Sequence, residues 1–211
     1  MQLTLYVDGY FVSQWDAVCM IALDEKGLAY ATARALLRDG GGVPAALAAR
    51  TGIATVPTLQ HGEVFITESQ AIVEYLEDVF PQPPLLPRNA VARAQTRQIM
   101  SFVRTSLWAL REEREMWTCF YPHELPLPPL TPAANADVRA LYAVVEHADL
   151  SEWTIGHADL ALSLLRLART GHELPSKAQR LLDASLIRPS VRGYLEHARP
   201  PNPPPHKLRA G

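Results

Sequence analysis

The sequence contains little cysteine and no excess of charge of either sign. Its 211 residues include two cysteines, Cys19 and Cys119, which lie too far apart for a CxxC motif or a metal-ligand spacing. We expect both to be reduced packing residues of a cytosolic protein. Twenty basic residues against 22 acidic ones leave a formal charge of −2. This balance gives no general electrostatic reason to bind nucleic acid or an acidic membrane.

Long apolar runs are also missing, which excludes a membrane-spanning helix. The first residues lead directly into a strand-like pattern, without the basic and then apolar segments of a secretory signal. The seven histidines show no HxxxH spacing, so we expect no metal. With 48% hydrophobic and 20% charged residues, the chain has a globular composition. We expect a cytoplasmic protein without a membrane partner.

Proline is abundant, and its 18 residues gather in three clusters. The cluster within residues 81–88 excludes helix and inner strand, because proline lacks an N–H and restricts the preceding residue. We interpret it as a linker between a first domain, residues 1–80, and a second domain, residues 89–199. A second cluster between 122 and 132 predicts a loop between helices. The third lies in a predicted tail, residues 200–211.

Before the linker, the apolar pattern alternates between strand and helix periods. Residues 2–7 alternate as a half-buried strand, 17–22 are typical of a helix that stops at Lys26-Gly27, and 30–37 weakly suggest a second strand. Residues 58–60 and 64–67 flank a short turn in which Gly62 needs a positive φ. A helix follows Ser69, with Glu77 predicted on its solvent side. This order, β-α-β, α, hairpin, α, predicts an α/β thioredoxin-like domain.

After the linker, every strong signal is helical. Ile99, Val103, Leu107 and Leu110 recur at helical spacing between charged positions. Residues 159–168 are apolar on most sides, which predicts a buried central helix. The second domain is therefore expected to be all-α.

A proline stands where a loop meets a strand, in Thr55-Val56-Pro57-Thr58. A trans proline that begins the strand is the ordinary alternative. In a thioredoxin-like fold, however, a proline at this position is cis and turns the backbone of the preceding residue outward. The N–H and C=O of Val56 would then pair with an extended cysteinyl peptide, as an added strand does.

Glu68-Ser69 lies at the turn into the next predicted helix. Ser69 has the chemistry of an N-cap residue, and a plain cap with an acidic neighbour is one interpretation. In the other, the N–H groups that begin the helix bind a carboxylate of a ligand. Glu68 would then accept a hydrogen bond from the ammonium group of the same ligand.

These motifs together resemble a cytosolic glutathione S-transferase over residues 3–195. The resemblance is carried by Leu5-Tyr6, Ser13, Leu23-Asp24-Glu25-Lys26-Gly27-Leu28, Thr55-Val56-Pro57 and Glu68-Ser69-Gln70-Ala71-Ile72. Arg111-Glu112-Glu113-Arg114 and Asp159-Leu160-Ala161-Leu162 make the chain most similar to the bacterial YfcF-like group. The resemblance implies glutathione as co-substrate, bound by Val56, Pro57, Glu68 and Ser69, and a homodimer.

By the same resemblance, Ser13 matches the catalytic serine that stabilises the glutathione thiolate; the alternative is a serine that only caps the first helix. A lowered thiol pKa is what a thiol nucleophile needs near neutral pH. Tyr6 is the rival, since other classes use a tyrosine at this strand. Gln14 replaces the proline usual after the serine, and Thr55 replaces a frequent basic residue, which leaves Arg50 as one candidate for the glycyl carboxylate.

Three further residues, Arg111, Arg114 and Trp117, are spaced to share one face of one predicted helix. They form either a solvated face or the wall of the cleft for the second substrate, an electrophile or a peroxide. Farther along, His157 stands where the family has the aspartate of a capping box, a change expected to cost up to about 1 kcal/mol. Three functions remain: a transferase or peroxidase, a non-catalytic binding or regulatory protein, and a glutathione-dependent isomerase.

Overall fold

A computed structural model describes residues 2–35, 42–123 and 127–202 of the chain. The chain divides between Pro83 and Pro84, inside the proline-rich stretch predicted as the linker. Unit 1 consists of the described residues up to Pro83 together with those from Glu196 onward, and unit 2 runs from Pro84 to Leu195. The predicted helical domain extended to residue 199, whereas Glu196 and the residues after it group with unit 1.

Unit 1 is built on a four-stranded mixed sheet, as the sequence predicts. Its strands are β1 (Leu3–Asp8), β2 (Tyr30–Ala35), β3 (Thr58–His61) and β4 (Val64–Thr67), in the order β2-β1-β3-β4. β1 runs parallel to β2 and antiparallel to β3, and β3 and β4 form the predicted hairpin. Gly62 has the positive φ expected at its turn. The end of the predicted second strand beyond residue 35 lies outside the described residues.

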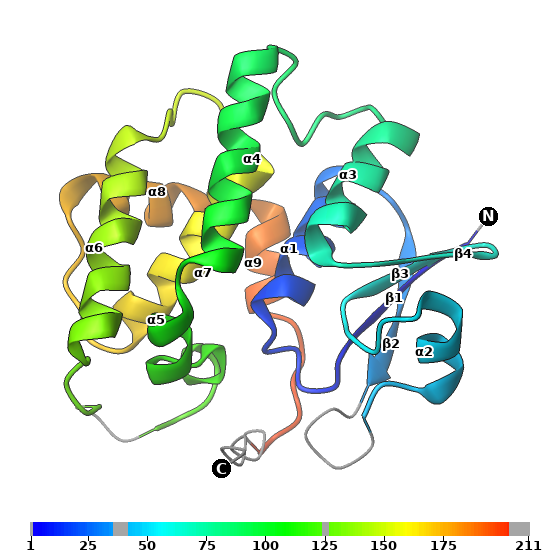
Figure 1. Cartoon of the computed structure of the whole chain (residues 1–211), viewed down its shortest axis with the longest axis horizontal. Coiled ribbons are helices and arrows are strands. Elements are labelled where there is room, and N and C mark those ends of the chain that lie inside the picture. Colours follow the sequence, from blue (N-terminus) through cyan, green and yellow to red (C-terminus); the bar gives the residue numbers. More distant parts are fainter. Residues whose placement is uncertain (1, 36–41, 124–126, 203–211) are drawn as a thin grey trace. The chain divides into compact units, whose positions relative to one another are not determined.

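Three helices accompany this sheet: α1 (Gln14–Glu25), α2 (Ala45–Thr51) and α3 (Ser69–Val79). α1 and α3 pack against each other beside the sheet, and α2 lies on its other side (Figure 1). α1 stops at the predicted place, since Lys26 is its C-cap and Gly27 has a φ of 63°. Cys19 of α1 donates its S–H to the carbonyl oxygen of Ser69, so this cysteine joins the two helices.

A buried cation fixes the far ends of α1 and α3. The Lys26 side chain is fully buried, and its Nζ lies 2.9 Å from Glu77 Oε2, 2.6 Å from the carbonyl oxygen of Phe80 and 3.0 Å from that of Pro83. The sequence pattern wrongly placed Glu77 on the solvent side. Glu77 is buried because this lysine gives its carboxylate a partner inside the unit.

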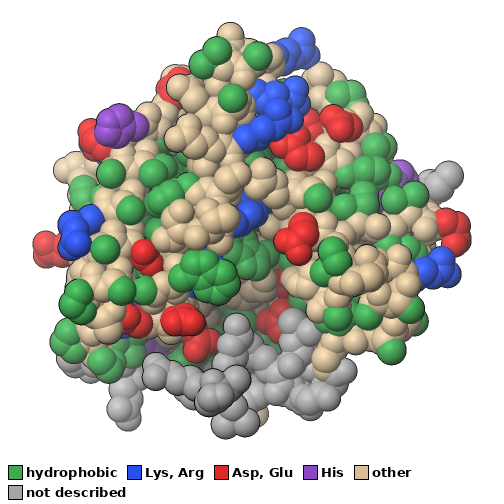
Figure 2. Space-filling view, in the orientation of Figure 1, with side chains coloured by type: hydrophobic (Ala, Val, Ile, Leu, Met, Phe, Trp, Pro, Cys, Tyr) green, Lys and Arg blue, Asp and Glu red, His purple; other side chains and the backbone are tan. Residues whose placement is uncertain are grey.

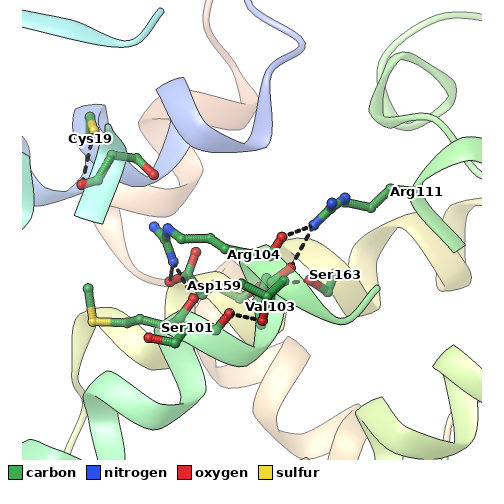
Figure 3. A network of polar contacts seen from close by, with 10 residues as sticks. Cys19, Ser101, Val103, Arg104, Arg111, Asp159 and Ser163 are labelled. Atoms are coloured by element: carbon green, nitrogen blue, oxygen red, sulfur yellow. Dashed lines mark hydrogen bonds and ion pairs between the residues drawn. The ribbon is translucent and has the colours of Figure 1, made fainter. Parts of the chain in front are cut away.

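All the secondary-structure elements described in unit 2 are helical. Its elements are α4 (Ala90–Thr105), α5 (Trp108–Glu113), the 3₁₀ turn η1 (Met116–Cys119), α6 (Pro132–His147), α7 (Ile155–Arg169), α8 (Ser176–Leu186) and α9 (Pro189–Leu195). α7 is the predicted central helix, with residues 155–167 all buried. Asp159 of α7 is fully buried and lies 2.7 Å from Arg104 Nη1 of α4 (Figure 3). None of the helices in the described part of the chain has the length and hydropathy that a bilayer span requires.

His157 completes a capping box at the start of α7. The N–H of Thr154 donates to His157 Nδ1 at 3.0 Å, and His157 Nε2 lies 2.8 Å from the carbonyl oxygen of Asp149. The ring must be neutral, with its proton on Nε2, to make both bonds. A histidine therefore performs the acceptor role of an acidic box residue, although it adds no negative charge to the helix N-terminus.

Candidate functional site

Three backbone features of unit 1 meet at one edge of its sheet. A short loop, residues 9–13, joins the end of β1 to the start of α1, and the antiparallel β3 starts beside that end of β1. β4 runs antiparallel to β3, so it ends at the same edge and passes directly into α3. We call this the α1–α3 edge; it carries Ser13, Val56-Pro57 and Glu68-Ser69. The topology thus brings together residues that lie far apart in the sequence.

The Val56-Pro57 peptide is cis, which confirms the prediction from the thioredoxin-like context. β3 begins at Thr58, so Val56 lies just before the hydrogen-bonded ladder. Its side chain is buried, and its carbonyl oxygen accepts a bond from the Thr55 hydroxyl at 3.2 Å. The side chain anchors the loop while the backbone stands at the α1–α3 edge, where an extended peptide can pair with it.

Glu68, rather than Ser69, is the N-cap of α3, which corrects the sequence-based assignment. Ser69 is the first helical residue and is buried, whereas Glu68 is exposed and has a φ of 67°. A non-glycine residue in this region is strained, and such strain is concentrated at binding sites. The N-terminus of a helix favours an anion, because its backbone N–H groups and the helix dipole point there.

Ser13 is the N-cap of α1 and lies half-buried at the α1–α3 edge. Its Oγ accepts a hydrogen bond from the Asp16 N–H at 3.3 Å. Acceptance uses a lone pair of the hydroxyl and not its hydrogen, so capping is compatible with donation to a sulfur atom. The helix N-terminus adds a favourable field for an anion of about 0.3–1 kcal/mol near the surface.

Tyr6 directs its hydroxyl toward Gln60 and donates to Gln60 Oε1 at 3.0 Å. In the β1–β3 register, Tyr6 pairs with Thr58, and Gln60 pairs with Thr4. Gln60 therefore lies back toward the start of β1, away from the end of β1 that precedes Ser13. This geometry favours Ser13 over Tyr6 as the hydroxyl near a bound thiol.

Two buried carboxyl groups beside Ser13 are absent from the sequence-based list. Asp8, the last residue of β1, is 3% exposed, and Asp16 in the first turn of α1 is 0% exposed. Asp16 Oδ2 accepts a 2.6 Å hydrogen bond from the Asp8 N–H. Burial raises the pKa of Asp16 well above its ordinary range, and the nearby Asp8 charge adds to the shift. The Ser-x-x-Asp spacing of Ser13 and Asp16 is the signal that could have drawn attention to this group.

Arg111, Arg114 and Trp117 do not share one helix, so that prediction is wrong. α5 ends at Glu113, Arg114 is its C-cap, and Trp117 lies in η1. Arg111 Nη1 donates to the carbonyl oxygens of Val103 and Arg104 at 2.8 and 2.9 Å, in the last turn of α4 (Figure 3). The last carbonyl groups of a helix lack donors within the helix, and Arg111 donates a hydrogen bond to two of those of α4.

Arg114 is also occupied within unit 2. It is 4% exposed and donates to the carbonyl oxygens of Glu113 and Pro128 at 2.8 and 2.6 Å. Trp117 is half-buried and packs edge-on against His123, with ring centroids 5.9 Å apart. These contacts favour a structural role for both arginines, whereas the Trp117 ring keeps an accessible part.

The described residues offer few other candidate sites. A hollow of about 630 Å³ in unit 2 is lined by residues of α4, α6 and the start of α7, and none of the predicted site residues lines it. Across the described part of the chain, no group of three His, Cys, Asp or Glu side chains is arranged to hold a metal. On the face in Figure 2, acidic and basic side chains are interspersed, without a large field of one sign.

Family models match both parts of the chain. The N-terminal domain of glutathione S-transferases matches residues 9–84, and the C-terminal domain matches residues 89–197. The chain belongs to the glutathione S-transferase family. Its four-stranded mixed sheet followed by a helical unit is the fold of that family.

Curated relatives of this glutathione S-transferase family member share about a third of the aligned residues. They include a stringent starvation protein A homolog of Histophilus somni (32% identical over 108 residues, 50% of each chain) and glutathione S-transferase Z1 of Arabidopsis thaliana (37% over 99 residues, 45% of each). A third is maleylacetoacetate isomerase of Dictyostelium discoideum (32% over 105 residues, 47% of this chain and 48% of the relative). The matches span about half the length of these relatives.

A solved structure matches much more of the chain. A glutathione transferase homolog from Burkholderia, with bound glutathione, is 28% identical and superposes with a TM-score of 0.73. The match covers 92% of this chain and 97% of that one.

Proposed function

We propose that this protein binds glutathione at the α1–α3 edge and activates its thiol for attack on an electrophile. The observation that supports this most directly is the meeting of the cis Val56-Pro57 peptide with the N-termini of α1 and α3 at one edge. The Val56 backbone would pair with the cysteinyl unit of glutathione. The start of α3 would bind the γ-glutamyl carboxylate, and Glu68 would accept from the γ-glutamyl ammonium.

Ser13 would then donate a hydrogen bond to the glutathione sulfur. The thiolate is the reacting form, so a donor and the N-terminal field of α1 both favour it by lowering the thiol pKa. The glycyl carboxylate needs a cation. Arg50, the candidate from the sequence, lies 3.5 Å from Glu63 in the β3–β4 turn, and the strand register puts that turn beside the start of β1, at the opposite end of the sheet from Val56-Pro57. This placement does not favour Arg50, although its exposed pair with Glu63 contributes little.

Two assays on the purified chain test this proposal: retention on immobilised glutathione, and turnover of a chromogenic aryl halide. We expect Ser13→Ala to lower kcat/KM about 10²-fold, as loss of one donor to a developing anion does. Tyr6→Phe is the matched control and should retain wild-type turnover, because its hydroxyl bonds to Gln60. Equal losses in the two variants would contradict the assignment of Ser13.

Retention on glutathione without turnover of any electrophile or peroxide would instead support a non-catalytic binding or regulatory role. The departures at Gln14 and Thr55 are the features that favour this alternative. Loss of retention in Glu68→Ala would still locate the ligand. Failure of the wild-type chain to bind glutathione at all would contradict both versions.

Isomerase chemistry is the second candidate, favoured by the relative named maleylacetoacetate isomerase. Glutathione-dependent cis–trans isomerisation of maleylacetoacetate, with no net consumption of glutathione, would distinguish it from conjugation. Glutathione-dependent peroxide reduction is tested in the same panel. For any of these reactions, Trp117→Ala should raise the KM of the second substrate and leave glutathione retention unchanged if its ring contacts that substrate.

We further propose that the protein falls within the bacterial YfcF-like group, on the Arg111-Glu112-Glu113-Arg114 and Asp159-Leu160-Ala161-Leu162 segments. We propose a cytoplasmic homodimer that uses no resident metal. Sedimentation velocity measures the oligomeric state, cell fractionation measures the location, and elemental analysis measures bound metal.

A further inference from the structure

The carboxyl group of Asp16 links the end of β1 to the residue that caps α1. Its Oδ2 accepts from the Asp8 N–H at 2.6 Å, while the Asp16 N–H donates to Ser13 Oγ at 3.3 Å. Asp8 Oδ2 lies 3.4 Å from the Val12 N–H, within the loop that leads to Ser13. The two carboxyl groups therefore hold both ends of the loop between β1 and α1.

The second oxygen of Asp16, Oδ1, has no hydrogen-bond partner among the described residues, although the side chain is completely buried. An ionised oxygen in such a position loses its hydration without compensation, which costs several kcal/mol. A protonated carboxyl avoids that cost. This geometry therefore favours the neutral acid, in agreement with the raised pKa that burial gives Asp16.

Burial is the largest influence on the pKa of Asp16 and outweighs the hydrogen bonds with the Asp8 N–H and the Ser13 side chain, which both lower it. Asp8 of β1 has the same sign and raises the pKa of Asp16 further. Basic side chains surround Phe11 in the loop instead: the Arg34 guanidinium lies 5.9 Å from its ring centroid, and Arg199 donates to its carbonyl oxygen. His197, half-exposed, packs against the Phe11 ring, with the ring centroids 4.1 Å apart and the planes tilted by 52°. On the α3 side, the buried acid is Glu77, which faces Lys26 at the opposite end of α1.

We propose that Asp16 is a positioning residue for the Ser13 hydroxyl, held as a neutral acid in a buried pair with Asp8. This inference rests on the proposed function of Ser13 for its catalytic consequence. The neutral carboxyl fixes the first turn of α1 against β1 and places no full negative charge beneath the thiolate. Ionisation of Asp16 adds a like charge close to that thiolate.

The pH dependence of kcat/KM with glutathione and the aryl halide tests the catalytic consequence. In the wild type, ionisation of the thiol raises kcat/KM with pH, and ionisation of Asp16 opposes that rise. Asp16→Asn keeps a neutral, isosteric group, so it should retain the effect of the thiol and lose that of Asp16. Asp16→Ala removes the link to Asp8 and should lower kcat/KM roughly 10- to 100-fold, the scale of a displaced catalytic group.

Asp24→Asn is the matched control, because Asp24 is an exposed acid of the same helix at its other end. It should reproduce the wild-type profile. Superimposable profiles for wild type and Asp16→Asn would overturn the inference, even if Asp16→Ala fails to fold.

A measurement on the chain without glutathione separates this inference from the proposed function. In ¹H–¹⁵N spectra, the Ser13 amide should shift with pH in one step at the pKa of Asp16, and Asp16→Asn should abolish that step. If the wild type turns over no substrate but the step is present, the proposed function fails and the buried pair stands. If the Ser13 amide shows no step, or keeps it in Asp16→Asn, the inference is wrong.

Discussion

Replacement of Lys26 by methionine should destabilise unit 1 far more than loss of an ordinary surface charge. The Lys26 side chain is 0% exposed and Glu77 6% exposed, so their 2.9 Å ion pair is shielded from water. Methionine fills most of the space of the lysine stem but brings no cation to Glu77. Removal of one partner from a buried pair costs about 3–5 kcal/mol. The carbonyl oxygens of Phe80 and Pro83 also lose a donor, but both residues lie near the surface, where water can replace it.

Urea denaturation of the purified variants, followed by circular dichroism, measures this effect. Arg50→Met is the control in the same unit, because the Arg50–Glu63 pair is 58% and 91% exposed. We expect it to change the free energy of unfolding by less than about 0.5 kcal/mol. The double variant Lys26→Met/Glu77→Leu removes both charges and should recover most of the loss. A cost below about 1 kcal/mol for Lys26→Met, or no recovery in the double variant, would refute the reasoning.

Three predictions concern unit 2. Burial lowers the pKa of His157 below the ordinary value of 6.5. The neutral ring therefore stabilises α7 fully above pH 6.5, and this stabilisation is lost as the pH falls through the folded-state pKa of His157. Thermal melts between pH 7 and 5 should therefore show a smaller loss for His157→Asn than for the wild type. Gly156→Ala should cost about 1–3 kcal/mol in urea, since the added Cβ would lie 3.0 Å from Thr96 Cγ2. Asp159→Ala should cost about 3–5 kcal/mol by the same assay, because it leaves Arg104, 15% exposed, without its buried carboxylate. An unchanged urea midpoint for Gly156→Ala or for Asp159→Ala would contradict the corresponding prediction.

The fold was predictable because its signals are periodic and local. Alternation in β1, the apolar surface of α7 and the Lys26-Gly27 stop each follow from neighbouring residues, and each agrees with the structure. The isomer of Pro57 was predictable from the context of the fold and not from local preference.

The errors came from contacts that no periodic pattern indicates. No periodicity indicates that Lys26 meets Glu77, so an acidic residue was assigned to solvent. Arg111 donates to the last carbonyl oxygens of α4. The helix that was predicted to carry Arg111, Arg114 and Trp117 ends at Glu113. The positive φ of Glu68 is likewise imposed by its position between β4 and α3. Side chains that satisfy backbone groups of other segments have no short-range signature.

The two ends of α1 are held by buried ionisable groups with opposite requirements. At the first turn, Asp16 lies beside Asp8, a group of like sign, and the favourable state is the one without its charge. At the last turn, Lys26 faces Glu77 and two carbonyl oxygens, which stabilise a full charge. Asp16 and Lys26 lie ten residues apart along α1, roughly 15 Å at 1.5 Å per residue, beyond the range at which neighbouring side chains couple strongly. The fixed end secures α1 against α3, so a change of protonation at the other end acts on the Ser13 turn without displacing the helix as a whole.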